Sequence, residues 1–195
     1  AMVVPNCMVS IAVNDTDFMS SMPPKLTAAT GMDALTHAIE AALSKNASPI
    51  TDKDAYWAMT AIVQNLPRAV ANGKDEKART MMAYAENMAG MAFSNVGLGV
   101  VHGMAHPLSA FYDTPHGVAN AVLLPYVMAF NAPYTGEKFR EIARAMGIGN
   151  VDAMSQEEYR QAAIDAVRQL SKDVGIPQTL REIGVKEEDL EALSE

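Results

Sequence analysis

Cysteine is almost absent from this sequence, which excludes one common way of stabilising a small fold. The 195 residues include a single cysteine, Cys7, which has no partner for an internal disulfide. A disulfide-stabilised extracellular domain is therefore unsupported, and a reducing compartment is favoured. The first residues also lack the basic segment and the uninterrupted apolar run of a signal peptide. We expect a cytoplasmic protein.

Clusters of positive charge and long apolar runs are missing as well. Lysine and arginine number 15 against 23 aspartates and glutamates, and the net charge of -8 would repel a phosphate backbone. The longest central apolar run, from Ala121 to Phe130, is about half of the roughly 20 residues that cross a bilayer, and Pro125 interrupts it. We expect neither nucleic acid nor a membrane as a partner.

Strand patterns are nearly absent, whereas helix-forming residues are abundant. Residues 9–13, VSIAV, have the composition of a strand, but no later segment repeats it as a pairing partner. From Pro23 onward alanine, leucine, methionine and glutamate dominate, and glycine and proline stand mostly at the ends of segments. The sequence predicts an all-α domain with a short stray strand near its N-terminus.

Start and stop signals divide the remainder into helices. Thr51 with Asp54 resembles a capping box for a helix that ends near Pro67, and Ser155 with Glu158 forms another. A segment punctuated by glycines ends at Pro107, and a short helix is expected after residue 186. The main helices are expected at about residues 24–43, 51–65, 75–93, 115–130 and 156–174.

The histidines are confined to two short apolar stretches. His37 follows Asp33 by four residues, so on a helix both side chains point to the same side and can converge on one ion. A buried carboxylate needs a cation or hydrogen bonds to offset its desolvation. The alternative is a structural pair in which Asp33 accepts a hydrogen bond from His37 or caps a neighbouring helix, and the spacing alone leaves both interpretations open.

Three further histidines lie close together in the second stretch. His102 and His106 repeat the four-residue spacing, and His116 follows in the turn TPHG. Isolated histidines on apolar helices are more often core residues than ligands, but here no histidine lies elsewhere, which favours a shared site. Imidazoles with one carboxylate suit Fe(II), Zn(II), Co(II) or Ni(II), and suit Mg or Ca poorly.

Two nearby features have a structural and a functional interpretation. Gly97 and Gly99 begin a near match to a dinucleotide-binding fingerprint, but His102 replaces the third glycine and no strand precedes the segment. Close backbone packing is therefore the better explanation of these glycines. Glu40, one turn after His37, either orients an imidazole or is a solvated carboxylate, and we leave it outside the predicted site.

Two long segments resemble the signature stretches of a known family, the iron-containing (group III) alcohol dehydrogenases. They are MPPKLTAATGMDALTHAIEA, residues 22–41, and FSNVGLGVVHGMAHPLSAFYDTPHGVANAVLLP, residues 93–125. The resemblance implies the C-terminal helical domain of the dehydroquinate synthase-like fold. It also implies a catalytic and cofactor-facing role for His106, near the nicotinamide and the substrate. The metal ligands that it implies are Asp33, His37, His102 and His116.

The same resemblance implies a chemistry. A divalent metal, Fe2+ first and Zn2+ second, acts as a Lewis acid while hydride passes between NAD(P)(H) and a small alcohol or aldehyde. Within the family the sequence is most similar to the lactaldehyde reductase (1,2-propanediol oxidoreductase) group. The implied partners are a small-molecule substrate and, for the full-length protein, further copies of itself.

The resemblance also predicts the domain organisation. Full-length members carry a Rossmann-like domain that binds most of NAD(P), and this sequence has none. We expect residues 1–20 to be a remnant of that domain and its linker, and residues 21–195 to be a C-terminally truncated helical metal-binding domain, inactive alone. The alternatives are a metal-dependent hydrolase using the same Asp/His site and a helical interaction domain with a structural histidine cluster.

Overall fold

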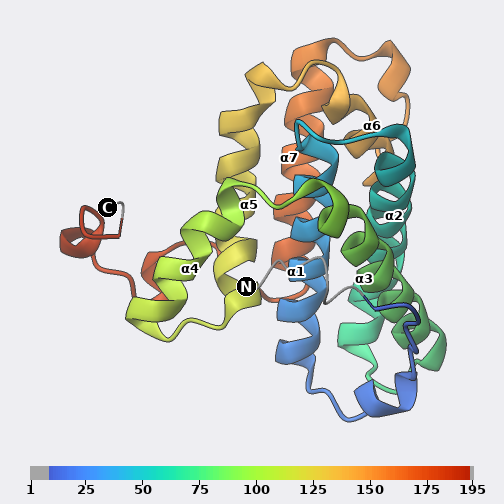
Figure 1. Ribbon diagram of the computed structural model, residues 1–195. Helices are drawn as coiled ribbons and strands as arrows, with labels where there is room; N and C mark the ends of the chain where they lie inside the picture. The colour runs from blue at the N-terminus through green and yellow to red at the C-terminus, as the bar shows by residue number, and fades with distance from the viewer. Residues whose placement is uncertain (1–8, 194–195) are drawn as a thin grey trace.

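The periodic apolar positions form long helices that pack around a central one. The computed structural model describes residues 9–193. In Figure 1, α1 and α7 run through the middle of the molecule, with α2 and α3 on one side and α4 and α5 on the other. The helices are α1 (Pro24–Leu43), α2 (Pro49–Ala71), α3 (Glu76–Val96), α4 (Val100–Tyr112), α5 (His116–Asn131), α6 (Lys138–Ala145) and α7 (Gln156–Asp173).

The central helix α1 is buried on most of its surface because its residues are small. Alanines such as Ala28, Ala34 and Ala38 are buried, and small side chains let the neighbouring helices approach closely. At Gly31 a Cβ atom would lie 2.3 Å from a terminal carbon of Leu66 in α2. The all-α prediction is confirmed, and α1 has the bounds that the sequence predicted.

The strand expected at residues 9–13 is wrong. No strand occurs anywhere in residues 9–193, and Val9, Ile11 and Val13 are exposed in an extended segment. A strand needs a neighbour to satisfy its backbone N–H and C=O groups, and the described chain offers none. The segment instead runs past α1 and α3, where it lines one side of an open groove.

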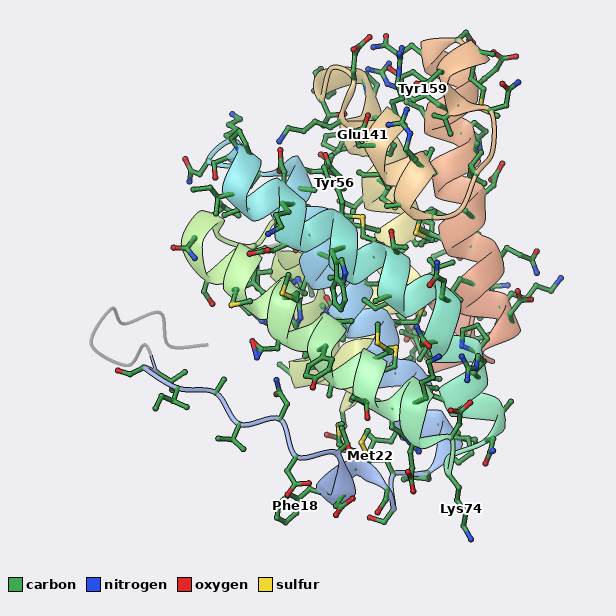
Figure 2. The ribbon with its side chains drawn as sticks, turned by 90° about the vertical axis from the view of Figure 1, so that its right-hand side faces the viewer. Phe18, Met22, Tyr56, Lys74, Glu141 and Tyr159 are labelled. Carbon is green, nitrogen blue, oxygen red and sulfur yellow. The ribbon has the colours of Figure 1, made fainter. Side chains whose placement is uncertain are left out.

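The start of α1 is held by a buried arginine. Arg79 of α3 donates from Nη1 to Thr27 Oγ1 at 2.7 Å and from Nη2 to the carbonyl of Met22 at 2.9 Å. Figure 2 shows Met22 where the N-terminal segment joins α1, beside the turn η2 (Thr16–Met19) that carries Phe18. These bonds fix the direction in which the preceding segment leaves the helical body.

Both predicted boundaries of α2 are wrong. The capping box that begins it pairs Ser48 with Thr51 rather than Thr51 with Asp54, and the helix continues past Pro67 to Ala71. Proline removes only one backbone donor, and burial of apolar residues such as Leu66 on either side of it outweighs that loss. The same effect extends α4 beyond Pro107, where the sequence predicted an end.

Other elements either agree with the prediction from the sequence or were not predicted. The capping box of Ser155 and Glu158 at the start of α7 is confirmed. The eight-residue α6 was not expected, whereas the short helix expected after Lys186 is present as the 3-10 helix η6 (Glu187–Asp189). No described helix has both the length and the apolarity to cross a membrane. Cys7 and the last two residues lie outside the described range.

Candidate metal centre

Three side chains predicted as ligands converge where α1 meets the start of α4. Asp33 and His37 lie one turn apart on α1, with His37 Nε2 3.9 Å from Asp33 Oδ1. His102 of α4 places its own Nε2 3.6 Å from the same oxygen. The potential ligand atoms of these three residues all lie within 4.8 Å of one another.

The fourth predicted ligand, His116, lies beside this trio but is not part of it. It is the first residue of α5, and its ring centroid is 5.4 Å from that of His102. Asn120, one turn later, has its Nδ2 2.6 Å from Asp33 Oδ1 and 3.0 Å from His116 Nε2. This amide therefore bridges Asp33 and His116, and its position four residues after a histidine is the one local pattern that points to it.

Close backbone contact between α5 and α1 holds His116 near the site. A Cβ atom on Gly117 would lie 2.3 Å from the carbonyl oxygen of Ala29 in α1. Only glycine permits this approach, because real Cβ contacts are never so short. The side chain before it, His116, is therefore carried toward Asp33 by the packing of two helix backbones.

His106, the predicted catalytic and cofactor-facing residue, occupies a different position from the ligands. Its side chain is exposed on α4, and its ring stacks on that of His116 with centroids 5.5 Å apart. It is absent from the compact trio. The structure thus places His106 apart from Asp33, His37 and His102 and next to His116.

Helix α3 supplies the surroundings of His37. The ring of Phe93 lies 4.6 Å from the imidazole, centroid to centroid, and Glu86 Oε1 lies 3.3 Å from His37 Nδ1. Half of the Glu86 side chain is exposed. The aromatic ring restricts the imidazole from one side, and Nε2 is the ring nitrogen that faces Asp33, 3.9 Å from its Oδ1.

Glu40, left outside the predicted site, belongs to it. It is 6% exposed, which rules out the solvated alternative, and its Oε2 lies 2.7 Å from His102 Nδ1. The same carboxylate accepts hydrogen bonds from the backbone N–H groups of Gly99 and Val101. Glu40 therefore already occupies two of the N–H groups at this helix start, and a phosphate there would meet its negative charge, which agrees with rejecting the dinucleotide fingerprint.

The electrostatics of the cluster show strong mutual coupling. Burial alone would raise the pKa of Asp33, but His102, His37 and Asn120 reverse this and hold that pKa below its usual value. Burial alone would lower the pKa of His102, but the nearby carboxylates of Asp33 and Glu40 raise it to about 9. The pKa of His116 is lowered by burial and by the neighbouring imidazoles.

The donor set suits a transition metal. For ligand bonds of about 2.1 Å, tetrahedral ligand atoms lie roughly 3.4 Å apart, close to the 3.6 and 3.9 Å between Asp33 Oδ1 and the two imidazole nitrogens. Moreover, His102 Nε2 is buried without a hydrogen-bond partner, as an atom reserved for an ion would be. Imidazole nitrogens with one carboxylate favour iron or zinc over magnesium or calcium.

An open groove gives access to the cluster. It has a volume of about 1000 Å³ and lies between residues 9–15, α1 and α3. Asp33 and Glu86 form part of its wall, together with small or apolar residues such as Gly90 and Met91. A small molecule in this groove would therefore reach the carboxylate side of the cluster.

Comparisons with known proteins agree on one family. Residues 27–195 match the family described as "Fe-containing alcohol dehydrogenase family, C-terminal". The chain is 54% identical over 191 residues to lactaldehyde reductase from Escherichia coli (strain K12), which covers 98% of this chain and 49% of that protein. It is 53% identical over 186 residues to 1,3-propanediol dehydrogenase from Citrobacter freundii, covering 95% and 48%.

A solved structure supports the same relationship. The crystal structure of a 1,3-propanediol oxidoreductase superimposes with a TM-score of 0.93 and 51% identity, covering 96% of this chain and 49% of that one. The resemblance stated from the two signature stretches is therefore confirmed, as is the C-terminal helical fold. The chain spans about half the length of the curated relatives it matches.

Proposed function

Because the chain belongs to the Fe-containing alcohol dehydrogenase family, we propose that it is the metal-binding part of an alcohol dehydrogenase or aldehyde reductase that uses NAD(P)(H). The observation that carries this proposal is the convergence of Asp33 Oδ1 with the Nε2 atoms of His37 and His102 beside an open groove. His116 is the fourth proposed ligand, from the start of α5. Fe2+ is the first candidate for the ion and Zn2+ the second.

The proposed chemistry divides between the ion and the chain. When bound, a divalent metal supplies Lewis-acid chemistry, which lowers the pKa of an alcohol and polarises an aldehyde carbonyl. The chain orients the ion through Asp33 and the imidazoles, and the groove admits a small substrate to the Asp33 side. We propose that His106, which is exposed and stacked on His116, contacts the nicotinamide and the substrate and assists proton transfer.

The dinucleotide is proposed to bind mainly outside this chain. The described residues form no strand and no βαβ unit, and Glu40 occupies the helix start at Gly99 that could have held a phosphate. The relatives are about twice as long as this chain. We propose that residues 1–20 lead from a nucleotide-binding domain into the helical domain at 21–195, and that the 195-residue chain alone does not turn over substrate.

The substrate is proposed to be a small alcohol or aldehyde such as lactaldehyde or 1,2-propanediol. Two similar proteins are named for small three-carbon substrates, a lactaldehyde and a propanediol. The full-length protein is proposed to form a homo-oligomer, which light scattering would test directly.

The test uses the protein in its natural length, loaded with Fe2+ or Zn2+ and assayed with NADH or NADPH and small aldehydes. We expect Asp33→Asn and His102→Ala each to lose bound metal and to reduce activity by at least about a hundredfold, because each removes a donor from the ion. Asp165→Asn on the exposed face of α7 serves as the control. Full activity in both site variants would overturn the metal assignment.

The hydrolase alternative makes a different prediction for the same material. A metal-activated water needs no dinucleotide, so ester or phosphoester turnover by the 195-residue chain alone, lost on chelation, would favour it. We expect no such turnover across a panel of esters.

A further inference from the structure

We propose that Glu40 is a positioning residue that fixes the ring of His102 for metal binding by anchoring it to the N-terminus of α4. This inference rests on the proposed metal site and adds a residue to it. Glu40 is not among the residues that line the groove; it acts through His102, from the side of the imidazole opposite to the proposed ion.

The first observation is that Glu40 is buried and that its side-chain hydrogen bonds all go to the start of α4, residues 99–102. Glu40 accepts from Gly99 N at 2.9 Å, from Val101 N at 2.7 Å and meets His102 Nδ1 at 2.7 Å. Among the residues that the structure describes, neither a lysine nor an arginine forms an ion pair with Glu40. A buried carboxylate needs either an ion pair or hydrogen bonds to offset its desolvation. The hydrogen bonds that Glu40 accepts at the start of α4 are therefore what keep it in place.

The second observation is that α4 has no cap of its own. Its N-cap residue is Gly99, which has no side chain to accept from the free N–H groups of the first turn. Glu40 of α1 satisfies two of them, and its negative charge also suits the positive end of the helix dipole. The position of the carboxylate is thereby fixed by backbone atoms rather than by flexible side chains.

The third observation concerns which nitrogen of His102 faces the proposed ion. Both oxygens of Glu40 already accept N–H groups, and an ionised carboxylate has no proton to give. His102 Nδ1 must therefore donate to Oε2, which leaves Nε2 as the nitrogen that faces Asp33 Oδ1, 3.6 Å away, and that is available to bind an ion once its proton is displaced. A carboxylate that holds the distal nitrogen of a ligating histidine both selects its tautomer and orients its ring.

Gly99 is required for this arrangement. A Cβ atom there would lie 2.7 Å from Glu40 Oε1 and 3.1 Å from Glu40 Cδ. An alanine at 99 would thus displace the carboxylate without changing its charge. Gly99, which was explained from the sequence by close packing, thus allows the carboxylate of Glu40 in α1 to reach the start of α4.

Glu86 offers a matched comparison on the neighbouring imidazole. It approaches His37 Nδ1 at 3.3 Å, but about half of its side chain is exposed and no helix start holds it. A solvated carboxylate at that distance contributes little orientation, because it can move and is screened. Comparing variants of the two glutamates therefore distinguishes a general effect of negative charge from the positioning that we assign to Glu40.

The experiment measures metal affinity in the protein in its natural length, using Co2+ as the probe. Metal-free wild type, Glu40→Gln, Gly99→Ala and Glu86→Gln are titrated with Co2+, and the visible ligand-field bands and dissociation constants are recorded. We expect Glu40→Gln and Gly99→Ala to weaken Co2+ binding by about tenfold to a hundredfold and to shift the bands. Glu86→Gln is expected to stay within about threefold of wild type.

Thermal unfolding of the same metal-free proteins separates positioning from a purely structural role. Gly99→Ala keeps the charge of Glu40, so it remains informative if Glu40→Gln does not fold. Unchanged Co2+ affinity and bands in both variants, with only a lower melting temperature, would overturn the role of Glu40. Absence of Co2+ binding by wild type itself would instead overturn the proposed function, and the role of Glu40 with it.

Discussion

Single residues decide which nitrogen of each imidazole faces Asp33. Asp33 Oδ1 lies near the Nε2 atoms of two imidazoles, and each of those rings has a carboxylate on its other nitrogen. Each ring therefore has one nitrogen toward Asp33 and the other toward a glutamate. This arrangement can be tested residue by residue.

His106 is expected to affect turnover without affecting metal content. It is exposed and lies outside the compact trio, whereas His116 lies beside Asp33. In the full-length protein, His106→Gln should retain its metal by elemental analysis and lose about a hundredfold in kcat/KM for aldehyde reduction, if it assists proton transfer. His116→Ala should lose metal as well. Loss of metal from His106→Gln would contradict the assignment of roles.

Gly117 is expected to tolerate no side chain. A Cβ atom would lie 2.3 Å from the Ala29 carbonyl oxygen and 2.7 Å from its carbon, both backbone atoms that cannot turn aside. Gly117→Ala should lower the free energy of unfolding by about 1–3 kcal/mol, as overpacking does, measured by urea denaturation. Gly90→Ala, with nothing within 4 Å, is the control and should be neutral or stabilising by up to about 1 kcal/mol.

The sequence predicted some of these residues and missed others for a physical reason. Asp33 and His37 were recognisable because helical spacing alone puts them together. Glu40 has equally good spacing, yet a buried and a solvated carboxylate look the same until the position of α4 is known. Asn120 lies 87 residues from Asp33, which its side chain contacts, so no local pattern could have identified it.

At the scale of elements, the start signal of α7 was confirmed, whereas the start signal of α2 and two proline stop signals were not. The capping box of Ser155 and Glu158 involves neighbours only, and it forms as predicted. Pro67 and Pro107 were expected to end helices, but packing of the residues around them carries both helices onward. The strand at 9–13 failed because strands depend on partners that the described residues do not supply.

The capping box of α7 is expected to make stability depend on pH. The pKa of Glu158 is lowered because its carboxylate accepts hydrogen bonds from Ser155, including one from the backbone N–H. Its stabilising effect is therefore fully present above its ordinary value of 4.5 and is lost as the pH falls through the lower, folded pKa. Between about pH 5 and pH 3, the melting temperature of wild type should fall more steeply than that of Glu158→Gln.

Glu157→Gln provides the comparison for this pH experiment. It removes a charge from the same first turn but leaves the capping box intact. Its melting temperature should follow the pH dependence of wild type. Equal slopes for Glu158→Gln and wild type would show that the cap carries no pH-dependent stability.

For the whole molecule, the proposed ion connects elements that are otherwise held by apolar packing. Asp33 and His37 lie on α1, His102 on α4 and His116 on α5, and Figure 1 shows α4 and α5 together on one side of α1. The fold class followed from composition and periodicity, but this meeting of three helices did not. It depends on the close contact of Gly117 with Ala29, which no local pattern predicts.

Metal removal is expected to destabilise the whole protein. A ligand at about 100 times its dissociation constant stabilises the folded state by about 2.7 kcal/mol, which corresponds to roughly 5–10 °C for a chain of this size. Calorimetry of the metal-loaded protein before and after chelation should show a shift of this size. Asp33→Asn should show none, and an equal shift in that variant would place the ion elsewhere.

A metal bound at the cluster would also constrain the unfolded chain as a disulfide does, although a single cysteine cannot form an internal disulfide. Coordination by Asp33 and His102 would close a loop running from residue 33 to residue 102, as a cross-link between distant cysteines does. For loops of this order the unfolded chain loses conformational entropy worth about 4 kcal/mol. A protein with one cysteine would then acquire a reversible cross-link that forms and opens with the supply of metal and that needs no pair of thiols.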